Sequence, residues 1–239
     1  MSRDVSGIAD RLAAIRARIE RAARHADRDP SRVKILAVSK THPPEAVLEA
    51  VRAGLVAFGE NRVQEAEAKI PAVRAACAAT LEWHLIGGLQ RNKARRAVEL
   101  CDVIQSVDRP ELLLALDKAA AEAGRRPRIF LQVNLDAEPQ KNGCAQSLLP
   151  ALAAGADACA HLELVGLMAI PRPCDNPEEV RPSFARLRKL LDSLNRERPR
   201  ERRLTELSMG MTGDFEVAVQ EGATWLRLGT ALFGERGKA

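Results

Sequence analysis

The sequence predicts a (β/α)8 barrel, in which eight parallel strands close into a cylinder and helices cover its outside. Three observations support this prediction: strand-like and helix-like segments alternate eight times, their connections are short, and the strand-like segments are near-continuous apolar runs. Continuous apolar runs are typical of parallel strands that are covered on both faces. Barrels of this class commonly have about 250 residues. We therefore expect the 239 residues, 1–239, to form a single domain.

A helix precedes the barrel, and four strand–helix units follow it. The leading helix spans residues 8–26, and its apolar residues recur at helical spacing to form one face: Ile8, Leu12, Ile15 and Ile19. The first four strands are expected at residues 33–39, 55–59, 83–86 and 103–107. Their helices are expected at residues 44–53, 62–78, 91–101 and 110–124. Pro110 and Gly124 are typical of the first turn and the stop of the last of these helices.

The second half of the chain repeats the same pattern. Its strands are expected at residues 128–135, 162–169, 206–208 and 225–228, and its helices at residues 146–158, 178–195 and 214–221, with a short last helix after Gly229-Thr230. The alternative is an open, doubly wound sheet that binds a dinucleotide. No GxGxxG motif follows the first strand, and no Pro/Gly/Ser-rich linker divides the chain, so the barrel is favoured.

Composition argues against several classes of function. A hydrophobic content of 46% and a charged content of 29% are ordinary for a globular protein. The net charge of +5 supports only weak affinity for phosphate groups, and no nucleic-acid-binding signature accompanies it. No apolar stretch approaches the length of a membrane span. We therefore expect neither a specific nucleic acid nor a membrane among the partners.

Cysteine and histidine usage indicates a cytoplasmic protein without a metal site. The five cysteines are odd in number, widely spaced and without a CxxC motif, and no signal peptide precedes them. Such cysteines are typical of reduced thiols in the cytosol. The four histidines show no metal-ligand spacing.

Lys40 is the most informative residue of the chain. It follows the apolar run Ile35-Leu36-Ala37-Val38 and precedes Thr41-His42-Pro43-Pro44, so it lies where a buried strand is expected to end. Burial of an ammonium group is costly and lowers its pKa, which favours a nucleophilic amine able to form a Schiff base. The alternative is a lysine whose long side chain reaches solvent at the strand end.

The other strand ends supply a set of groups suited to a phosphate. The residues expected there are Glu60-Asn61, His84, Gly87-Gly88, Ser106, Asn134, Met168, Ser208 and Arg227-Leu228-Gly229-Thr230. Barrels often bind phosphate with the loops after strands seven and eight, which here are Ser208–Gly213 and Gly229-Thr230. Glycines let backbone N–H groups approach phosphate oxygens, and Ser208 and Thr230 add hydroxyl groups. The alternative is that these glycines only end strands and start helices.

A phosphate site opposite a nucleophilic lysine indicates pyridoxal 5′-phosphate (PLP). A Schiff-base aldolase is the other chemistry open to Lys40, with Glu60 and His84 as its acid and base. Arg227 favours PLP, because it lies beside the phosphate loop and is placed to meet the pyridine nitrogen of a cofactor. An arginine cannot accept the nitrogen's proton, so the ring would be a weaker sink for carbanions than one facing an aspartate. Arg227 in an ion pair with a nearby carboxylate is the competing interpretation.

Several motifs together resemble the pyridoxal phosphate homeostasis protein family (YggS/PROSC). They run in the family's order from about Val33 to Gly234 and comprise Ala37–Thr41, Phe58–Glu65, Trp83–Lys93, Gly166–Met168, Leu207–Met211 and Arg227–Gly234. The resemblance implies a barrel similar to the N-terminal domain of alanine racemase, with PLP bound as an internal aldimine. Carried over by position, Lys40 holds the aldimine and Arg227 faces the pyridine nitrogen. By the same resemblance, Ser208, Gly229 and Thr230 bind the phosphate. Asn61 and His84 line the pocket near the ring.

The absence of tyrosine argues against a racemase. A racemase needs a base on each face of the substrate α-carbon, and fold-related racemases take one of the two from a tyrosine. This chain has no tyrosine, and few residues follow Gly234 to build a second domain. We therefore expect a protein that stores, buffers or delivers PLP without robust catalysis. A PLP-dependent amino-acid racemase remains the alternative. The expected partners are PLP and PLP-dependent apoenzymes, and the expected state is a monomer.

Overall fold

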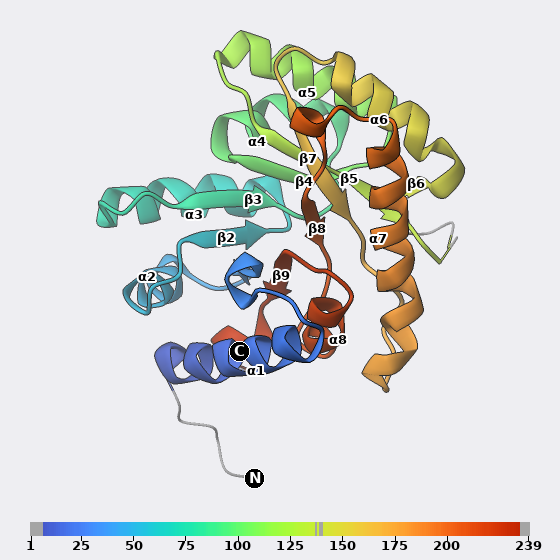
Figure 1. The fold of residues 1–239 in the computed structure, drawn as a ribbon. Coiled ribbons are helices and arrows are strands. Elements are labelled where there is room, and N and C mark those ends of the chain that lie inside the picture. The colour runs from blue at the N-terminus through green and yellow to red at the C-terminus, as the bar shows by residue number, and fades with distance from the viewer. Residues whose placement is uncertain (1–6, 137, 139–140, 235–239) are drawn as a thin grey trace.

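The computed structural model describes residues 7–136, 138 and 141–234 and shows a closed barrel of eight parallel strands (Figure 1). The barrel strands are β1 (Lys34–Val38), β2 (Ala57–Glu60), β3 (Glu82–Leu85), β4 (Val103–Val107), β5 (Arg128–Asn134), β7 (Glu163–Met168), β8 (Glu206–Ser208) and β9 (Trp225–Leu228). The last strand pairs with the first from Lys34↔Trp225 to Ala37↔Leu228, which closes the cylinder. The predicted fold is confirmed.

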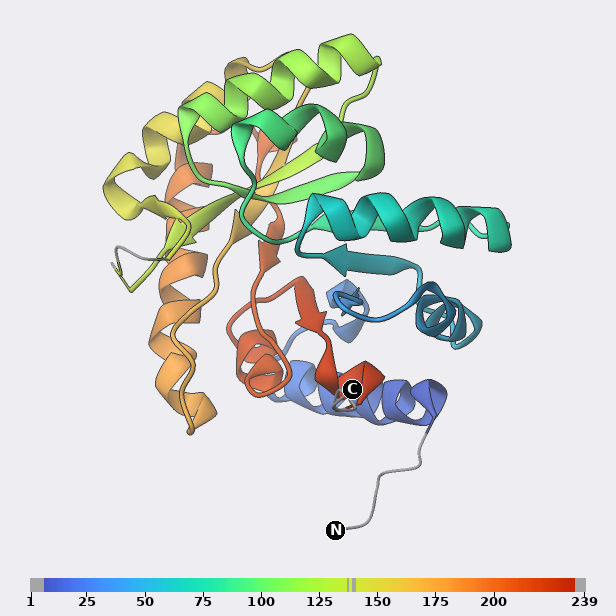
Figure 2. The same ribbon diagram turned by 180° about the vertical axis from the view of Figure 1, so that it is seen from behind.

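Helices surround the barrel, as Figure 2 shows from behind. They are α1 (Ile8–His25), α2 (Pro44–Arg52), α3 (Val63–Ala76), α4 (Ala94–Leu100), α5 (Pro110–Ala123), α6 (Leu149–Ala158), α7 (Arg181–Arg196), α8 (Phe215–Gln220) and α9 (Thr230–Phe233). Three predicted helices begin with a 3-10 turn instead of an α-turn: η2 (Arg91–Lys93), η3 (Gln146–Leu148) and η4 (Pro177–Val180). Such tight turns are frequent at helix N-termini. None of the helices within the described ranges is long and apolar enough to cross a bilayer.

Three short elements were not predicted. The two-residue strand β6 (Cys144–Ala145) pairs with the end of β5, and the 3-10 turns η1 (Pro30–Arg32) and η5 (Arg200–Arg202) precede β1 and β8. They contain too few residues to show a hydrophobic period. All five cysteines, which lie in the described part of the chain, are free thiols.

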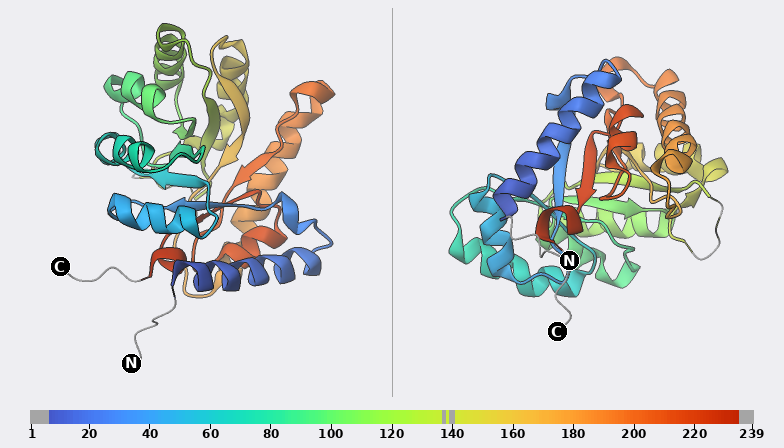
Figure 3. Two further views of the ribbon diagram at one scale, coloured as in Figure 1. Left: turned by 90° about the vertical axis from the view of Figure 1, so that its left-hand side faces the viewer. Right: turned by 90° about the horizontal axis from the view of Figure 1, so that it is seen from below.

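The leading helix α1 lies across the side of the barrel formed by β9, α8 and α9 (Figure 3). Its predicted apolar face is buried: Ile8, Leu12, Ile15 and Ile19 are each at most 4% exposed. On the rim of this contact, Arg18 donates to Glu216 of α8 at 2.9 Å and stacks over the ring of Phe215. The helix is therefore part of the core, and it covers the last strand of the barrel.

The core has two layers. One layer fills the barrel itself and contains Leu36, Val38, Ala57, Ile86, Val103, Phe130, Met168 and Trp225. The other layer lies between the strands and the helices and includes Ala37, Phe58 and Leu226. Neighbouring residues of one strand thus point to opposite layers, as a strand's period of two requires. By this alternation the inward row of β1 continues from Leu36 and Val38 to Lys40.

Removing one side chain of the α1 face tests its place in the core. We expect Leu12→Ala to lower the free energy of unfolding by about 2–5 kcal/mol, because Leu12 is 1% exposed and its truncation leaves a cavity. The exposed Arg16 of the same helix is the control, and Arg16→Ala should change stability by at most about 0.5 kcal/mol. Urea unfolding followed by circular dichroism measures both. Equal stabilities of the two variants would contradict the packing of α1.

Candidate functional site

A cavity of about 530 Å³ opens at the C-terminal ends of the barrel strands. This volume is within the range of about 300–1,000 Å³ that is typical of small-molecule sites. Five of the predicted site residues line it: Lys40, Asn61, Arg227, Gly229 and Thr230. They come from the ends of β1, β2 and β9. The barrel thus gathers residues that are up to 190 positions apart in the sequence around one space.

Lys40 lies in this cavity with a free side chain. It is the second residue after β1, on the inward row, and it is partly exposed rather than buried. Lys40 is therefore less buried than predicted, because the strand ends two residues earlier and Lys40 faces an open space. No hydrogen bond or ion pair engages its Nζ within the described residues. Its amine is available to a ligand in the cavity.

The backbone turns sharply just after Lys40. The N–H of His42 donates to the carbonyl of Ser39 at 3.0 Å, and the N–H of Thr41 donates to the carboxylate of Glu65 at 3.2 Å. Thr41 has φ +65°, a conformation that a β-branched residue rarely adopts and that costs on the order of 1–3 kcal/mol. Strain of this kind persists only where surrounding contacts hold it. Here the two hydrogen bonds fix the turn that follows Lys40.

A buried ion pair supports the same turn from the helix side of the sheet. Lys69 of α3 donates to the Oε1 atom of Glu60 at 2.6 Å and to the carbonyl of Ser39 at 2.7 Å. The hydroxyl of Ser39 donates to the same Glu60 oxygen at 2.7 Å. Burial raises the pKa of Glu60, and the hydrogen bonds from Lys69 and Ser39 oppose that rise. The pair therefore anchors the residue that precedes Lys40.

Arg227 forms the floor of the cavity and is 4% exposed. Its guanidinium donates to the hydroxyl of Ser208 at 2.8 Å and to the carbonyl of Ala169 at 2.8 Å. Burial lowers its pKa to about 10, against the attraction of Asp214, so it stays protonated at neutral pH. No carboxylate forms an ion pair with Arg227 in the described part of the chain. The competing interpretation of Arg227 as half of an ion pair is therefore wrong.

The loops after β8 and β9 meet at one wall of the cavity. The hydroxyl of Thr212 accepts a hydrogen bond from the N–H of Ala231 at 3.3 Å, which joins the two loops. Gly210 allows the first loop to turn: it has φ +93°, and a Cβ there would lie 2.5 Å from Ala218. Gly229, Thr230 and Thr212 therefore present backbone and hydroxyl groups together.

Two predicted residues lie outside the cavity. Ser208 is fully buried beneath it, and its hydroxyl donates to Gln105 and accepts from Arg227. His84 is also fully buried and lies farther down the barrel, where its ring nitrogens engage Glu82 and Gln105. Both side chains point inward from strands, but below the layer that the cavity exposes. Ser208 and His84 therefore do not line the cavity, and their contacts with phosphate and with the ring stay predictions.

Sequence reasoning missed three polar residues of the cavity: Thr212, Gln132 and Asn142. Thr212 lies in the loop Ser208–Gly213 that the sequence indicated, where Ser208 was the predicted hydroxyl. Gln132 donates to the carbonyl of Asn142 at 3.1 Å, and the side chain of Asn142 covers Gly88. Nothing local in the sequence marks Asn142, because its place depends on how the loop after β5 folds over the mouth.

Comparisons with known proteins agree with this fold. The family model for the N-terminal domain of alanine racemase matches residues 11–237. The pyridoxal phosphate homeostasis protein of Pseudomonas aeruginosa is 47% identical over 233 residues, covering 97% of each chain. The protein of the same name from Aquifex aeolicus is 41% identical over 227 residues, 95% of this chain and 97% of its own.

Solved structures extend the comparison. PipY of Synechococcus elongatus, with PLP bound, is 43% identical with a TM-score of 0.84, over 95% of this chain and 100% of its own. Alanine racemase of Corynebacterium glutamicum has a TM-score of 0.69 at 16% identity, over 94% of this chain and 62% of its own, a likeness of fold alone.

The buried ion pair behind Lys40 gives a testable stability effect. We expect Lys69→Met to lower the free energy of unfolding by about 3–5 kcal/mol at pH 7, because it leaves the Glu60 carboxylate buried without its cation. Without Lys69 the raised pKa of Glu60 is opposed by fewer groups, so the folded state binds a proton that the unfolded state releases. Stability of the variant should therefore fall as pH rises above the ordinary range of a glutamate.

Chemical unfolding between pH 5 and pH 8 measures this dependence, and the double variant Glu60→Gln/Lys69→Met is the matched control. It should recover part of the lost stability and lose the pH dependence, because no buried carboxylate is left. A double variant as unstable as Lys69→Met would contradict the role of the ion pair.

Proposed function

The chain belongs to the pyridoxal phosphate homeostasis protein family, which has the fold of the alanine racemase N-terminal domain, and we propose that it binds PLP in the cavity at the barrel mouth. The observation that carries this proposal is the free amine of Lys40, which shares one cavity with the loops after β8 and β9. The related PipY, solved with PLP bound, supports it.

The groups around the cavity fit the cofactor. When bound, PLP supplies an aldehyde that condenses reversibly with an amine and a ring that can withdraw electrons. Lys40 has the amine for that condensation. Gly229, Thr230 and Thr212 have the donors for a phosphate, and Thr212 is proposed for the role predicted for Ser208. Asn61, which directly follows β2, is another polar residue of the cavity.

Arg227 decides what the bound cofactor can do. Its guanidinium is a donor only, since the pKa of about 10 keeps it protonated, so it cannot act as the acid–base partner of a pyridine nitrogen as an aspartate does. The chain also has no tyrosine to serve as a second base. We propose that the protein holds PLP reversibly for storage, buffering or delivery, without robust catalysis.

The proposal extends to the setting in which the protein works. We propose that residues 1–239 form a single PLP-binding barrel domain that binds the cofactor as a monomer, because the described residues proposed to contact PLP all belong to one barrel. The expected recipients are PLP-dependent apoenzymes, and the expected compartment is the cytoplasm, in agreement with the five free thiols.

Replacing Lys40 tests the cofactor site. We expect wild-type protein incubated with PLP to be yellow and, after borohydride reduction, to carry the cofactor's mass on the peptide that contains Lys40. Lys40→Ala should lose both signals, because no other lysine lines the cavity. The exposed Lys118 is the control, and Lys118→Ala should bind as wild type does. Absorbance and peptide mass spectrometry measure the outcome, and a colourless wild type would contradict the proposal.

Proton exchange distinguishes a carrier from a racemase. Loaded protein incubated with a panel of L-amino acids in D2O should show no exchange of the α-proton at enzymatic rates, because Arg227 makes the ring a weak electron sink and no second base is present. Proton NMR measures the exchange. Exchange at about 1 per second or faster would favour the racemase alternative.

A further inference from the structure

The inside of the barrel contains a continuous chain of hydrogen bonds that begins at Arg227. The guanidinium donates to the hydroxyl of Ser208 at 2.8 Å, and that hydroxyl donates to the Oε1 atom of Gln105 at 2.6 Å. The Nε2 atom of Gln105 meets the Nδ1 atom of His84 at 2.7 Å. The other ring nitrogen of His84 meets the carboxylate of Glu82. Five side chains thus connect the floor of the cavity to the opposite end of the barrel.

The hydrogen bonds of this series are all donated in the same direction, from Arg227 toward Glu82. An amide nitrogen only donates, so the Nδ1 atom of His84 accepts from Gln105 and the ring proton lies on Nε2, where it is donated to Glu82. The reverse orientation of the Gln105 amide would make the Nε2 atom of His84 an acceptor facing a carboxylate. It would also direct an amide donor at Ser208, which already accepts from Arg227. Only the first orientation gives each donor an acceptor.

The charges at the two ends agree with this direction. Burial lowers the pKa of His84 despite the opposing hydrogen bond to Glu82, so the imidazole is neutral. Burial alone raises the pKa of Glu82, but the hydrogen bonds from His84 and Arg128 and the charge of Arg128 outweigh that effect and lower it. A series of neutral, polarised groups therefore connects the buried guanidinium of Arg227 with the carboxylate of Glu82. No nearer carboxylate is in ion-pair contact with Arg227 among the described residues.

We propose that Gln105 and His84 are positioning residues for the cofactor, which rests on the proposed function. Gln105 fixes the hydroxyl proton of Ser208, and the oxygen of that hydroxyl then holds one nitrogen of Arg227. With the carbonyl of Ala169 holding the other, the guanidinium has a single orientation toward the cavity. His84 and Glu82 hold the far side of Gln105. The orientation of the group that faces the cofactor thus depends on residues that lie beyond the cavity.

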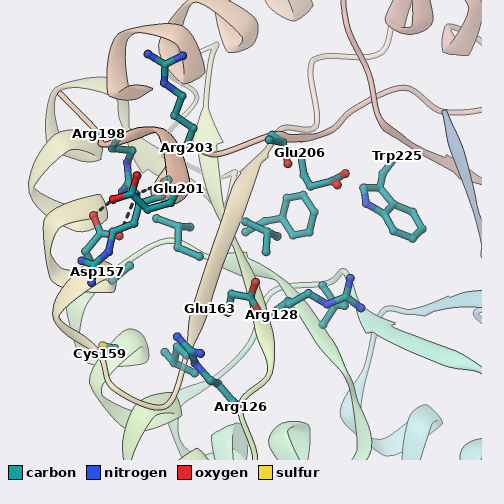
Figure 4. A pocket seen from close by; sticks show the side chains of 18 of the residues that line it. Arg126, Arg128, Asp157, Cys159, Glu163, Arg198, Glu201, Arg203, Glu206 and Trp225 are labelled. Carbon is teal, nitrogen blue, oxygen red and sulfur yellow. Dashed lines mark hydrogen bonds and ion pairs between the residues drawn. The ribbon is translucent and has the colours of Figure 1, made fainter. Parts of the chain in front are cut away.

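The far end of the chain lies beside a second hollow, of about 500 Å³, at the N-terminal ends of the strands. His84, Arg128 and Trp225 line it, and Arg128 forms an ion pair with Glu82 at 2.7 Å. Figure 4 shows that the guanidinium groups of Arg126, Arg128 and Arg203 point in different directions around this hollow. They do not converge on one anion. The hollow therefore gives the chain a solvent-facing end rather than a second phosphate site.

Removing hydrogen bonds at two separate positions of this series tests the proposal. Gln105→Met and His84→Phe each remove one link with a side chain of similar size. Each should weaken PLP binding by about ten- to a hundredfold, the loss expected for one hydrogen bond to a charged group. Because both changes interrupt the same chain, the double variant should be little weaker than either single variant. The absorption maximum of bound PLP should also shift, which a purely structural role would not produce.

Two further variants keep the test decisive. Asn195→Ala removes partly buried hydrogen bonds with Leu204, outside the hydrogen-bond chain, and should cost stability without changing PLP affinity or absorbance. Glu82→Gln keeps an acceptor for His84 but removes the charge. Glu82 is partly exposed, so this variant tests the hydrogen-bond chain even if the interior variants do not fold, and it should weaken binding about threefold, less than the loss of a whole hydrogen bond to a charged group.

Circular dichroism confirms folding, and titration with PLP followed by absorbance gives the dissociation constants. Folded variants with wild-type affinity and absorbance would overturn the positioning role while leaving the proposed function intact. Wild-type protein that takes up no PLP would instead overturn the proposed function, and with it this inference.

Discussion

The pairing of β9 with β1 is the interaction on which the site depends. It closes the barrel and sets Ala37 opposite Leu228, so that the ends of the first and last strands emerge side by side. Lys40 and Gly229-Thr230 follow those ends directly and therefore face the same cavity. In an open sheet the first and last strands would be edges, and these residues would lie apart. The closure also explains why α1 packs where it does, because its apolar face covers the strand that completes the cylinder.

Closure creates a second constraint, since polar groups that point into the barrel lose water. Arg227, Ser208, Gln105 and His84 all point inward and are at most 4% exposed. Each unsatisfied group would cost several kcal/mol, so their hydrogen bonds to one another are a condition of folding as well as of function. A rigid, cationic floor is the result. Such a floor offers no base to a bound ring, which agrees with the proposed binding of PLP without robust catalysis.

The turn after Lys40 is also held in place by several contacts at once. Three features lie in or contact residues 39–41, the segment whose middle residue is Lys40. They are the strained backbone of Thr41, its hydrogen bond to Glu65, and the buried ion pair of Glu60 and Lys69. None of them lines the cavity except Lys40 itself. The amine is left free while its backbone is fixed, and reversible capture of an aldehyde needs both conditions.

The sequence by itself determined the fold and pointed to Lys40 and to the two loops that line the cavity, because these follow from local signals. Apolar runs mark the strands, glycines and prolines mark their ends, and a lysine at a strand end is unusual wherever the strand lies. Tertiary structure alone decided how deep each inward residue sits. Ser208 and Thr212 are hydroxyl residues four positions apart, and His84 and Asn61 lie in or just after strands, so the sequence could not rank their depths. Depth in a barrel depends on the register between strands, and register is a relation among distant segments that no single segment contains.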